Sequence, residues 1–107
     1  MISSPTKRVE DLSLAQRERL AYIDFLLYFF GEIGRPDLIE RFGVAPAGAT
    51  RDFALYREIA PHNIIFDSSN KIYRIAQTFS PLFDHLSQRV LSALAQGFGE
   101  GANGATQ

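Results

Sequence analysis

The 107-residue chain has a formal net charge of −1, is 46% hydrophobic and 21% charged, and contains no cysteine. This length allows one domain with a substantial core, and this composition is typical of a folded protein rather than a disordered chain. The lack of cysteine excludes disulfides, thiolate nucleophiles and cysteine-based zinc or iron–sulfur sites.

The first twelve residues are polar, with an early Pro5 and the cations Lys7 and Arg8. Because this segment is polar, we expect residues 1–12 to form a flexible arm. It lacks the apolar run of a secretory signal. The longest apolar run, from Phe25 to Phe30, is too short to cross a bilayer. The sequence therefore predicts a soluble protein with no membrane partner.

A first helix is expected over Leu14–Phe30. Ser13 and Gln16 have the spacing of a capping box, which satisfies free backbone N–H groups at a helix start. The apolar residues cover more than one side of this helix, so we expect its second side to contact a partner subunit or the C-terminal helix. These residues are Leu20, Tyr22, Ile23, Phe25, Leu26, Leu27, Phe29 and Phe30.

Two more helices are expected, at 36–42 and 46–59, with a tight turn at Gly43 between them. Pro36 and Pro46 stand at first-turn positions, where the missing N–H costs nothing. Ala45 lacks a capping side chain, which weakens the start of the third helix by about 1 kcal/mol. The side of that helix expected to point inward carries Ala49, Phe53, Tyr56 and Ile59 or Ala60.

After Pro61 the pattern changes from helix to strand. Residues 64–67 and 71–75 are rich in β-branched and aromatic side chains around an Asp/Ser/Asn turn, which predicts a β-hairpin. A last helix is expected from Ser80-Pro81 to about Gln96, and the glycine-rich residues 97–107 are expected to be a disordered tail. The domain itself would span residues 13–96, with Phe83, Leu86, Val90 and Leu94 on one face of its last helix.

Three helices followed by a two-stranded hairpin predict a mainly α fold, the winged helix-turn-helix, with an extra C-terminal helix. In this fold the third helix enters the major groove of DNA. Small residues would allow close approach, Thr50 can bond a phosphate or a base, Arg51 can bind guanine, and Arg57 is better placed for a phosphate. The candidate DNA-binding residues of this helix are Ala47, Gly48, Thr50, Arg51, Ala54 and Arg57.

The hairpin turn carries short hydrogen-bond donors and cations, which suit phosphates or a minor groove. Arg35 lies at a helix start, where free N–H groups also favour a phosphate. The candidate DNA-binding residues of the wing are Ser68, Ser69, Asn70, Lys71 and Arg74.

Other interpretations remain open at these positions. Arg51 can pair with Asp52 or Asp37 instead of a base, and Lys71 can serve only to keep an edge strand soluble. The net charge near zero favours a second functional class, a winged helix that contacts protein, such as an antirepressor or an assembly subunit.

Enzyme function has little support in the sequence. His62 and His85 are the only histidines, and each is expected to be a cap or surface residue. There is no glycine-rich phosphate loop, no paired-histidine metal spacing and no GxSxG motif. We therefore expect a non-enzyme with no metal and no cofactor.

Five segments, 34–45, 51–56, 60–67, 71–73 and 79–83, together resemble a known family. The most specific part is Pro61-x-Asn63-x-x-x-Asp67 followed by Lys71-x-Tyr73. Over about residues 20–94 the chain resembles the N-terminal domain of WYL-domain transcriptional repressors, in particular the CapW/BrxR-like group that controls bacterial phage-defence operons.

The resemblance implies a homodimeric, cytoplasmic, nucleoid-associated repressor of bacteria that binds double-stranded DNA at an inverted repeat. The dimer would form through the first helix, the C-terminal helix or both. Thr50 and Arg51 would lie in the recognition helix and Lys71 in the wing. Such repressors continue into a ligand-sensing WYL domain, whereas this chain ends in a glycine-rich tail. The effector site is therefore expected to be absent from this chain.

Overall fold

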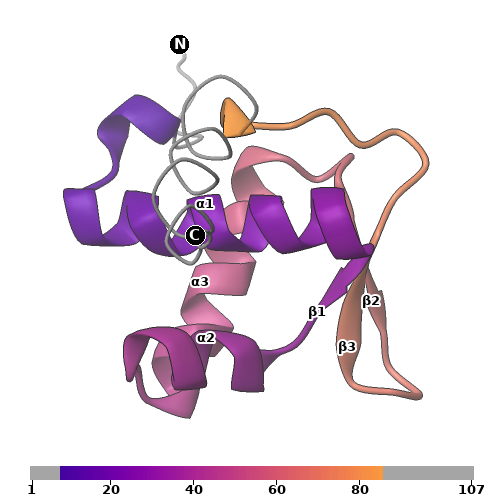
Figure 1. Cartoon of the computed structure of the whole chain (residues 1–107), viewed down its shortest axis with the longest axis horizontal. Coiled ribbons are helices and arrows are strands. Elements are labelled where there is room, and N and C mark those ends of the chain that lie inside the picture. Colours follow the sequence, from indigo (N-terminus) through magenta and orange to yellow (C-terminus); the bar gives the residue numbers. More distant parts are fainter. Residues whose placement is uncertain (1–7, 86–107) are drawn as a thin grey trace, which may run out of the picture.

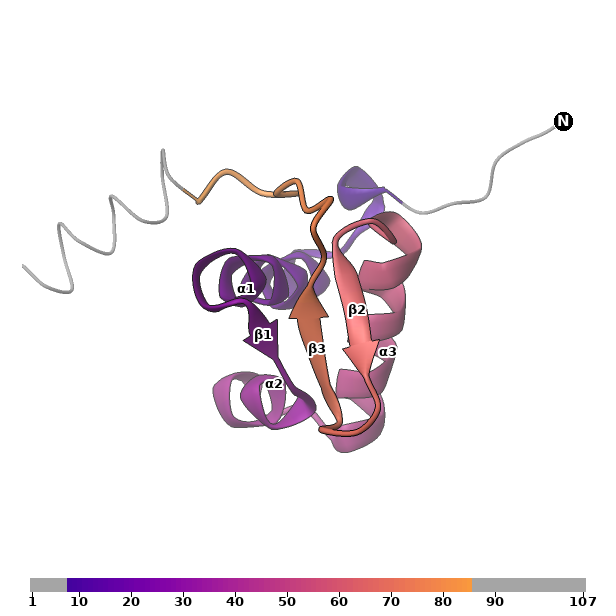
Figure 2. The ribbon, with the colours of Figure 1, turned by 90° about the vertical axis from the view of Figure 1, so that its right-hand side faces the viewer.

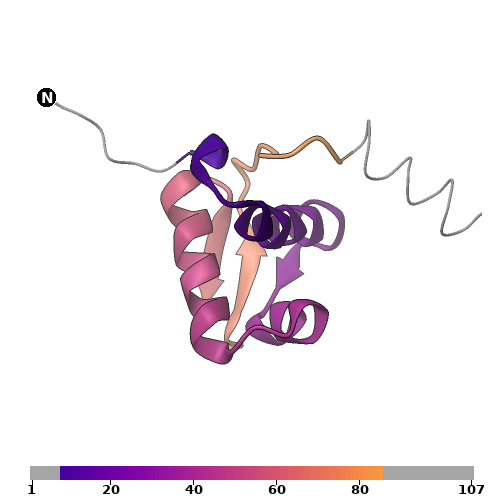
Figure 3. The same cartoon turned by 90° about the vertical axis from the view of Figure 1, so that its left-hand side faces the viewer.

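The computed structural model describes residues 8–85 and places the three predicted helices on one side of a small sheet (Figure 1). Figure 2 looks onto the sheet with the helices behind it, and Figure 3 shows the helices from the opposite side. The elements in chain order are the 3-10 helix η1 (Val9–Asp11), α1 (Leu14–Phe30), β1 (Glu32–Ile33), α2 (Arg35–Phe42), α3 (Pro46–Ile59), β2 (Ile64–Asp67) and β3 (Ile72–Ile75).

The predicted ends of the first and third helices are confirmed, and α2 begins at Arg35, one residue before the predicted start. The Ser13 hydroxyl accepts a hydrogen bond from the Gln16 backbone N–H, and the Gln16 side chain accepts one from the Ser13 N–H, both at 3.2 Å. Gly31 and Gly43 end α1 and α2 with φ of +81° and +71°, a conformation that favours glycine. Ala45 precedes α3 without a side-chain cap, as expected.

The sheet has three strands, where the sequence predicted two. The extra strand β1 pairs antiparallel with β3, which gives the order β1-β3-β2. Ile33 lies opposite Tyr73, and the Ile75 N–H bonds the Gly31 carbonyl at 2.9 Å. Two residues between helices carry no periodic signal, so β1 could not be found from the pattern. The pairing joins the connection between α1 and α2 to the base of the hairpin.

The core lies between α1, α3 and the sheet. The inward side of α3 is confirmed, since Ala49, Phe53, Tyr56 and Ala60 are fully buried. Phe53 stacks on Tyr73 of β3, with ring centroids 4.1 Å apart and an interplanar angle of 9°. This contact joins the inner side of α3 to the sheet.

The described chain covers the apolar residues of α1 unevenly. Leu20, Ile23 and Leu27 are buried, whereas Tyr28, Phe29 and Phe30 are 38%, 42% and 69% exposed. Of the second side expected from the sequence, Tyr22, Phe25 and Leu26 are half-buried, and Phe29 is exposed at the end of α1.

A buried carboxylate, Asp24 of α1, connects three parts of the chain. It accepts hydrogen bonds from the Tyr56 hydroxyl of α3 and from the backbone N–H groups of Leu82 and Phe83, at 3.0 and 3.1 Å. Its Oδ2 also lies 2.8 Å from Nε2 of His85. Burial, together with the nearby Asp24 charge, raises the pKa of Tyr56, so its hydroxyl remains a donor.

Asn63 extends this network to the segment after the sheet. Its Nδ2 donates to the Tyr56 hydroxyl at 3.1 Å and to the Ser80 carbonyl at 2.8 Å. Its Oδ1 accepts from the Ser80 N–H at 2.8 Å. The asparagine of the Pro-x-Asn motif is therefore a buried structural residue.

The network corrects the prediction for His85, which was expected to be a cap or surface residue. The residue is only 2% exposed, because Asp24 pairs with its ring and Phe25, Tyr28 and Phe29 surround it. His62, in contrast, is exposed as expected.

The two ends of the predicted domain are described only in part. Residues 81–84 form no helix, so the last helix does not begin at Ser80-Pro81 as predicted. The remainder of that predicted helix, up to Gln96, lies outside the described residues. The predicted tail 97–107 and residues 1–7 of the arm lie outside them as well. At the other end, η1 falls within the predicted arm, and Leu12, which follows it, is buried in the core.

Removal of the Tyr56 hydroxyl tests the buried network. Tyr56→Phe leaves Asp24 and Asn63 each without one partner, so we expect the free energy of unfolding to fall by about 1–3 kcal/mol. Urea unfolding followed by circular dichroism measures this loss. Tyr28→Phe is the control, because Tyr28 is partly exposed. It should change stability by less than about 0.5 kcal/mol, and equal losses in the two variants would contradict the role of the network.

Candidate nucleic-acid interface

The side of α3 opposite the core is uncovered. Gly48 is half-buried, and the other five candidate residues of this helix, Ala47, Thr50, Arg51, Ala54 and Arg57, are all exposed. The helical period produces this arrangement, because Ala49, Phe53 and Tyr56 turn the opposite side into the core. No part of residues 8–85 therefore stands between this side of α3 and a ligand.

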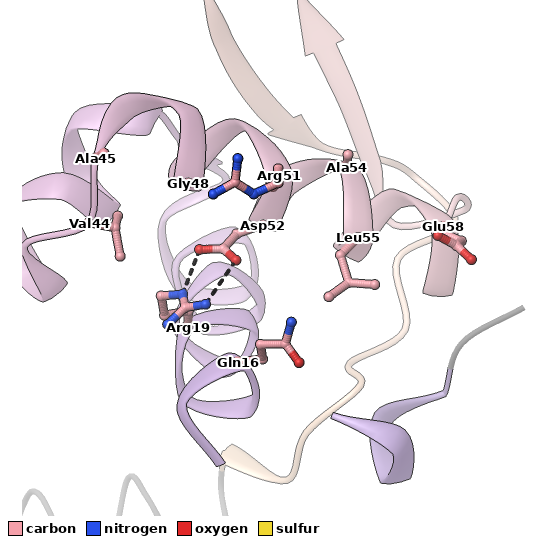
Figure 4. Close-up of a pocket in the computed structure, with 10 residues that line it drawn as sticks. All are labelled: Gln16, Arg19, Val44, Ala45, Gly48, Arg51, Asp52, Ala54, Leu55 and Glu58. Atoms are coloured by element: carbon pink, nitrogen blue, oxygen red, sulfur yellow. Dashed lines mark hydrogen bonds and ion pairs between the residues drawn. The ribbon is translucent and has the colours of Figure 1, made fainter. Parts of the chain in front are cut away.

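Neither acidic residue considered for Arg51 pairs with it. Asp52 is bound by Arg19 of α1, through Nε at 2.6 Å and Nη2 at 3.3 Å (Figure 4). Asp37 accepts the Gly34 N–H at 2.7 Å, at the start of α2. Within the described chain, the exposed Arg51 side chain thus remains available to an outside partner.

An open cavity of about 530 Å³ flanks α3 on the side of α1 (Figure 4). Arg51 and Ala54 line it together with Gln16 and Arg19 of α1. The hollow therefore lies directly beside the exposed side of α3.

Arg35 and Thr50, fifteen residues apart in the chain, meet beside the first turn of α3. Arg35 Nη1 donates to Thr50 Oγ1 at 3.2 Å, and the Thr50 hydroxyl donates to the Pro46 carbonyl at 3.1 Å. The two candidate residues therefore form one polar surface across α2 and α3.

The turn of the hairpin and the first turn of α3 both lie toward the lower edge of Figure 1, where the hairpin turn stands to the right of α3. We call β2, β3 and their turn at 68–71 the wing. Its four turn residues, Ser68, Ser69, Asn70 and Lys71, are exposed. The structure therefore places the wing turn and the first-turn residues of α3 toward the same edge of the domain, whereas Arg57 lies in the last turn of α3, away from that edge.

Arg74 has a different setting from the other candidate cations. Its Nε donates to Asp67 at 3.0 Å and its Nη1 donates to Glu32 of β1 at 2.9 Å. These contacts, first the hydrogen bond that Arg74 donates to Asp67, raise the pKa of Arg74. The sequence predicted neither carboxylate as a partner of Arg74. The Glu32 contact in particular depends on the unpredicted strand β1.

The formal charge of the chain hides a local excess of available cations. Arg35, Arg51, Arg57 and Lys71 are exposed at α2, α3 and the wing. Several acidic residues nearby are already engaged, Asp37 with a backbone N–H, Asp52 with Arg19 and Asp67 within the wing. This end of the domain therefore favours an anionic partner more than the net charge of −1 suggests.

Residues 8–85 contain no cluster of three His, Asp or Glu side chains that could hold a metal ion. In the same part of the chain, every helix is too short or too polar to span a membrane.

A model of the BrxR transcriptional regulator winged helix-turn-helix domain matches residues 15–96. The chain belongs to this family. The match confirms the winged-helix prediction and the expected family resemblance, and it identifies a domain of a transcriptional regulator rather than an enzyme, as expected.

Several bacterial proteins named DNA-binding transcriptional repressor CapW are similar to this BrxR-family domain. The protein from Escherichia coli (strain KTE188) is 35% identical over 68 residues, 64% of this chain and 23% of the relative. The one from Stenotrophomonas maltophilia is 34% identical over 67 residues, which are 63% of this chain and 22% of that relative. The one from Pseudomonas aeruginosa is 32% identical over 68 residues, which are 64% of this chain and 23% of that relative. The matched part is thus less than a quarter of each relative.

Replacement by alanine should affect stability in opposite directions at Gly48, in the first turn of α3, and at Gly43, just before that helix. A Cβ on Gly48 would lie 3.6 Å from the Val44 Cβ, an ordinary contact, so Gly48→Ala should leave stability unchanged or raise it by up to about 1 kcal/mol. Gly43 has φ of +71°, so Gly43→Ala should lower stability by about 1–2 kcal/mol. Thermal unfolding measures both, and destabilisation by Gly48→Ala would show that its surroundings are more crowded than the structure indicates.

Proposed function

We propose that this domain binds double-stranded DNA and is the DNA-reading part of a transcriptional repressor. The observation that carries the proposal is the uncovered, small-residue side of α3, on which Arg51 is left without an intramolecular ion pair in the described chain. Membership of the BrxR winged-helix family and similarity to repressors named CapW support the same conclusion.

In this proposal α3 is the recognition helix. Ala47, Gly48 and Ala54 allow the helix backbone to approach the floor of the major groove. The Arg51 guanidinium has the geometry to donate two hydrogen bonds to O6 and N7 of a guanine. Thr50 lies one position earlier and can contact a base or a phosphate, and Arg57, about two turns along, can reach a phosphate.

Phosphate contacts on either side would fix the orientation of α3. Arg35 lies beside Thr50, and Lys71 stands in the wing turn with three short hydrogen-bond donors before it, Ser68, Ser69 and Asn70. Such contacts supply affinity and register without reading the sequence. The proposed location is accordingly the bacterial cytoplasm, with access to chromosomal DNA.

We further propose a homodimer on an inverted repeat. The exposed Tyr28, Phe29 and Phe30 at the end of α1 support it, because a cluster of large apolar side chains on a small domain is typical of a contact surface. Symmetric winged-helix dimers place their recognition helices about 34 Å apart, one turn of DNA.

One observation favours a second candidate function, a winged helix that contacts protein. The net charge of −1 is low for a DNA-binding domain. The two functions differ in a simple property, since a protein-contact module should not retain generic duplex DNA even at low salt.

Replacement of Arg51 tests the proposed reading surface. In a gel shift with the upstream region of its own gene, Arg51→Ala should weaken specific binding by about 1–3 kcal/mol, because a bidentate base contact is lost. Arg17→Ala is the charge-matched control, since Arg17 is exposed and its side chain donates to the Val9 carbonyl at the other end of the domain. Equal binding by wild type and Arg51→Ala would contradict the assignment. No retention of generic duplex at low salt would favour the protein-contact function.

The dimer makes its own prediction. The wild-type chain should have twice the monomer mass in light scattering at high micromolar concentration, and Phe29→Ser with Phe30→Ser should lower this toward the monomer mass. The control is Ile65→Ser, which removes an exposed apolar side chain from the wing instead. A strictly monomeric wild type would remove the dimer from the proposal.

A further inference from the structure

Asp67 is an acidic residue on the hairpin that the proposed function turns toward DNA. By charge alone it should repel phosphates, so its loss should strengthen binding. Its contacts indicate a different effect.

Both oxygens of Asp67 are occupied by the wing itself. Oδ1 accepts from the Ser69 N–H at 3.0 Å, the Ser69 hydroxyl at 2.8 Å and the Asn70 N–H at 3.3 Å. Oδ2 accepts from Asn70 Nδ2 at 2.9 Å and from Arg74 Nε at 3.0 Å. One carboxylate therefore fixes the backbone and side chains of the turn.

This turn determines how Lys71 is presented. Lys71 follows Asn70 directly and has φ of +59°, a left-handed conformation that is uncommon for a residue other than glycine. Across the pair, Asp67 lies opposite Ile72, the residue after Lys71. The backbone is thus held on both sides of Lys71, by Asn70 before it and by Ile72 after it.

Arg74 of β3 links the Asp67 carboxylate to strand β1. Because its other contact is Glu32 of β1, one guanidinium joins side chains from all three strands. Two carboxylates already balance its charge, so a phosphate would gain little from it.

We propose that Asp67 and Arg74 are positioning residues for DNA binding: Asp67 holds the wing turn so that Lys71 meets a phosphate, and Arg74 holds Asp67 to the sheet instead of contacting DNA. The inference rests on the proposed function. The side-chain hydrogen bonds of Asn70 and Ser69, followed by that of Arg74, hold the pKa of Asp67 well below its usual range, so the carboxylate stays ionised at any working pH.

The experiment measures affinity of the full chain for the same upstream duplex over a range of salt concentrations. Asp67→Ala should weaken binding by about three- to tenfold and lower the salt slope by about one, as Lys71→Ala does. In the Lys71→Ala background, Asp67→Ala should cause no further weakening. A general loss of structure would weaken binding in both backgrounds, so this comparison isolates positioning.

Two controls separate charge from position. Glu40→Ala removes the same charge from an exposed site on α2, and binding should stay equal or become stronger. Arg74→Gln should weaken binding and lower the salt slope by no more than Asp67→Ala does, because it acts through the same position of Lys71, and in the Lys71→Ala background it should cause no further loss. A further loss of affinity and of salt slope in that background would instead make Arg74 a phosphate contact and overturn its part of the proposal.

The outcomes distinguish this inference from the function on which it rests. If the wild-type chain binds and Asp67→Ala binds equally or more tightly, the positioning role is wrong and DNA binding stands. If the wild type binds no duplex at low salt, both fall. Should Asp67→Ala fail to fold in thermal unfolding, Asp67→Asn replaces it. Asparagine keeps an acceptor for the turn but loses the ion pair, so weaker binding supports the proposal and tighter binding overturns it.

Discussion

The arrangement of the domain depends on the buried carboxylate of Asp24. A charged group removed from water is costly unless its oxygens are fully hydrogen-bonded. Here Tyr56 of α3, two backbone N–H groups after the sheet and the His85 ring meet that requirement together. These partners lie 32 to 61 residues away in the chain. The carboxylate is therefore satisfied only when α1, α3 and the later segment are all in place.

This constraint also bears on the proposed DNA surface. Tyr56 fixes how α3 is rotated about its own axis, because its ring must point at Asp24 and Asn63. One rotation of a helix sets both sides at once. With Tyr56 turned inward, Arg51 and Ala54 must face outward, and the Arg19–Asp52 ion pair keeps the neighbouring carboxylate away from Arg51. The outer surface is thus a consequence of inner contacts.

Much of this fold could be predicted because its signals are local. The Ser13–Gln16 capping box, the helix-opening prolines and the terminal glycines mark the helices. The β-branched and aromatic residues on either side of a polar turn mark the hairpin. The roles of Asp24, His85 and β1 could not, because each depends on partners distant in the chain. The same limit applies to the candidate site. Exposure on α3 followed from periodicity, whereas the pairing of Arg74 with Glu32 required the unpredicted strand.

The engaged carboxylates also explain how a nearly neutral chain can suit an anionic partner. A net charge counts every acid equally, but Asp24, Asp52 and Asp67 each accept several hydrogen bonds from within the domain. Those donors balance part of the negative charge of these carboxylates. Arg19 balances Asp52 in addition, and Arg74 balances Asp67. Arg35, Arg51, Arg57 and Lys71 remain exposed. Exposed Glu40 and Glu58 offset only part of this charge. What a partner meets is therefore the charge that folding leaves free, and on α2, α3 and the wing turn exposed cations outnumber the exposed acids.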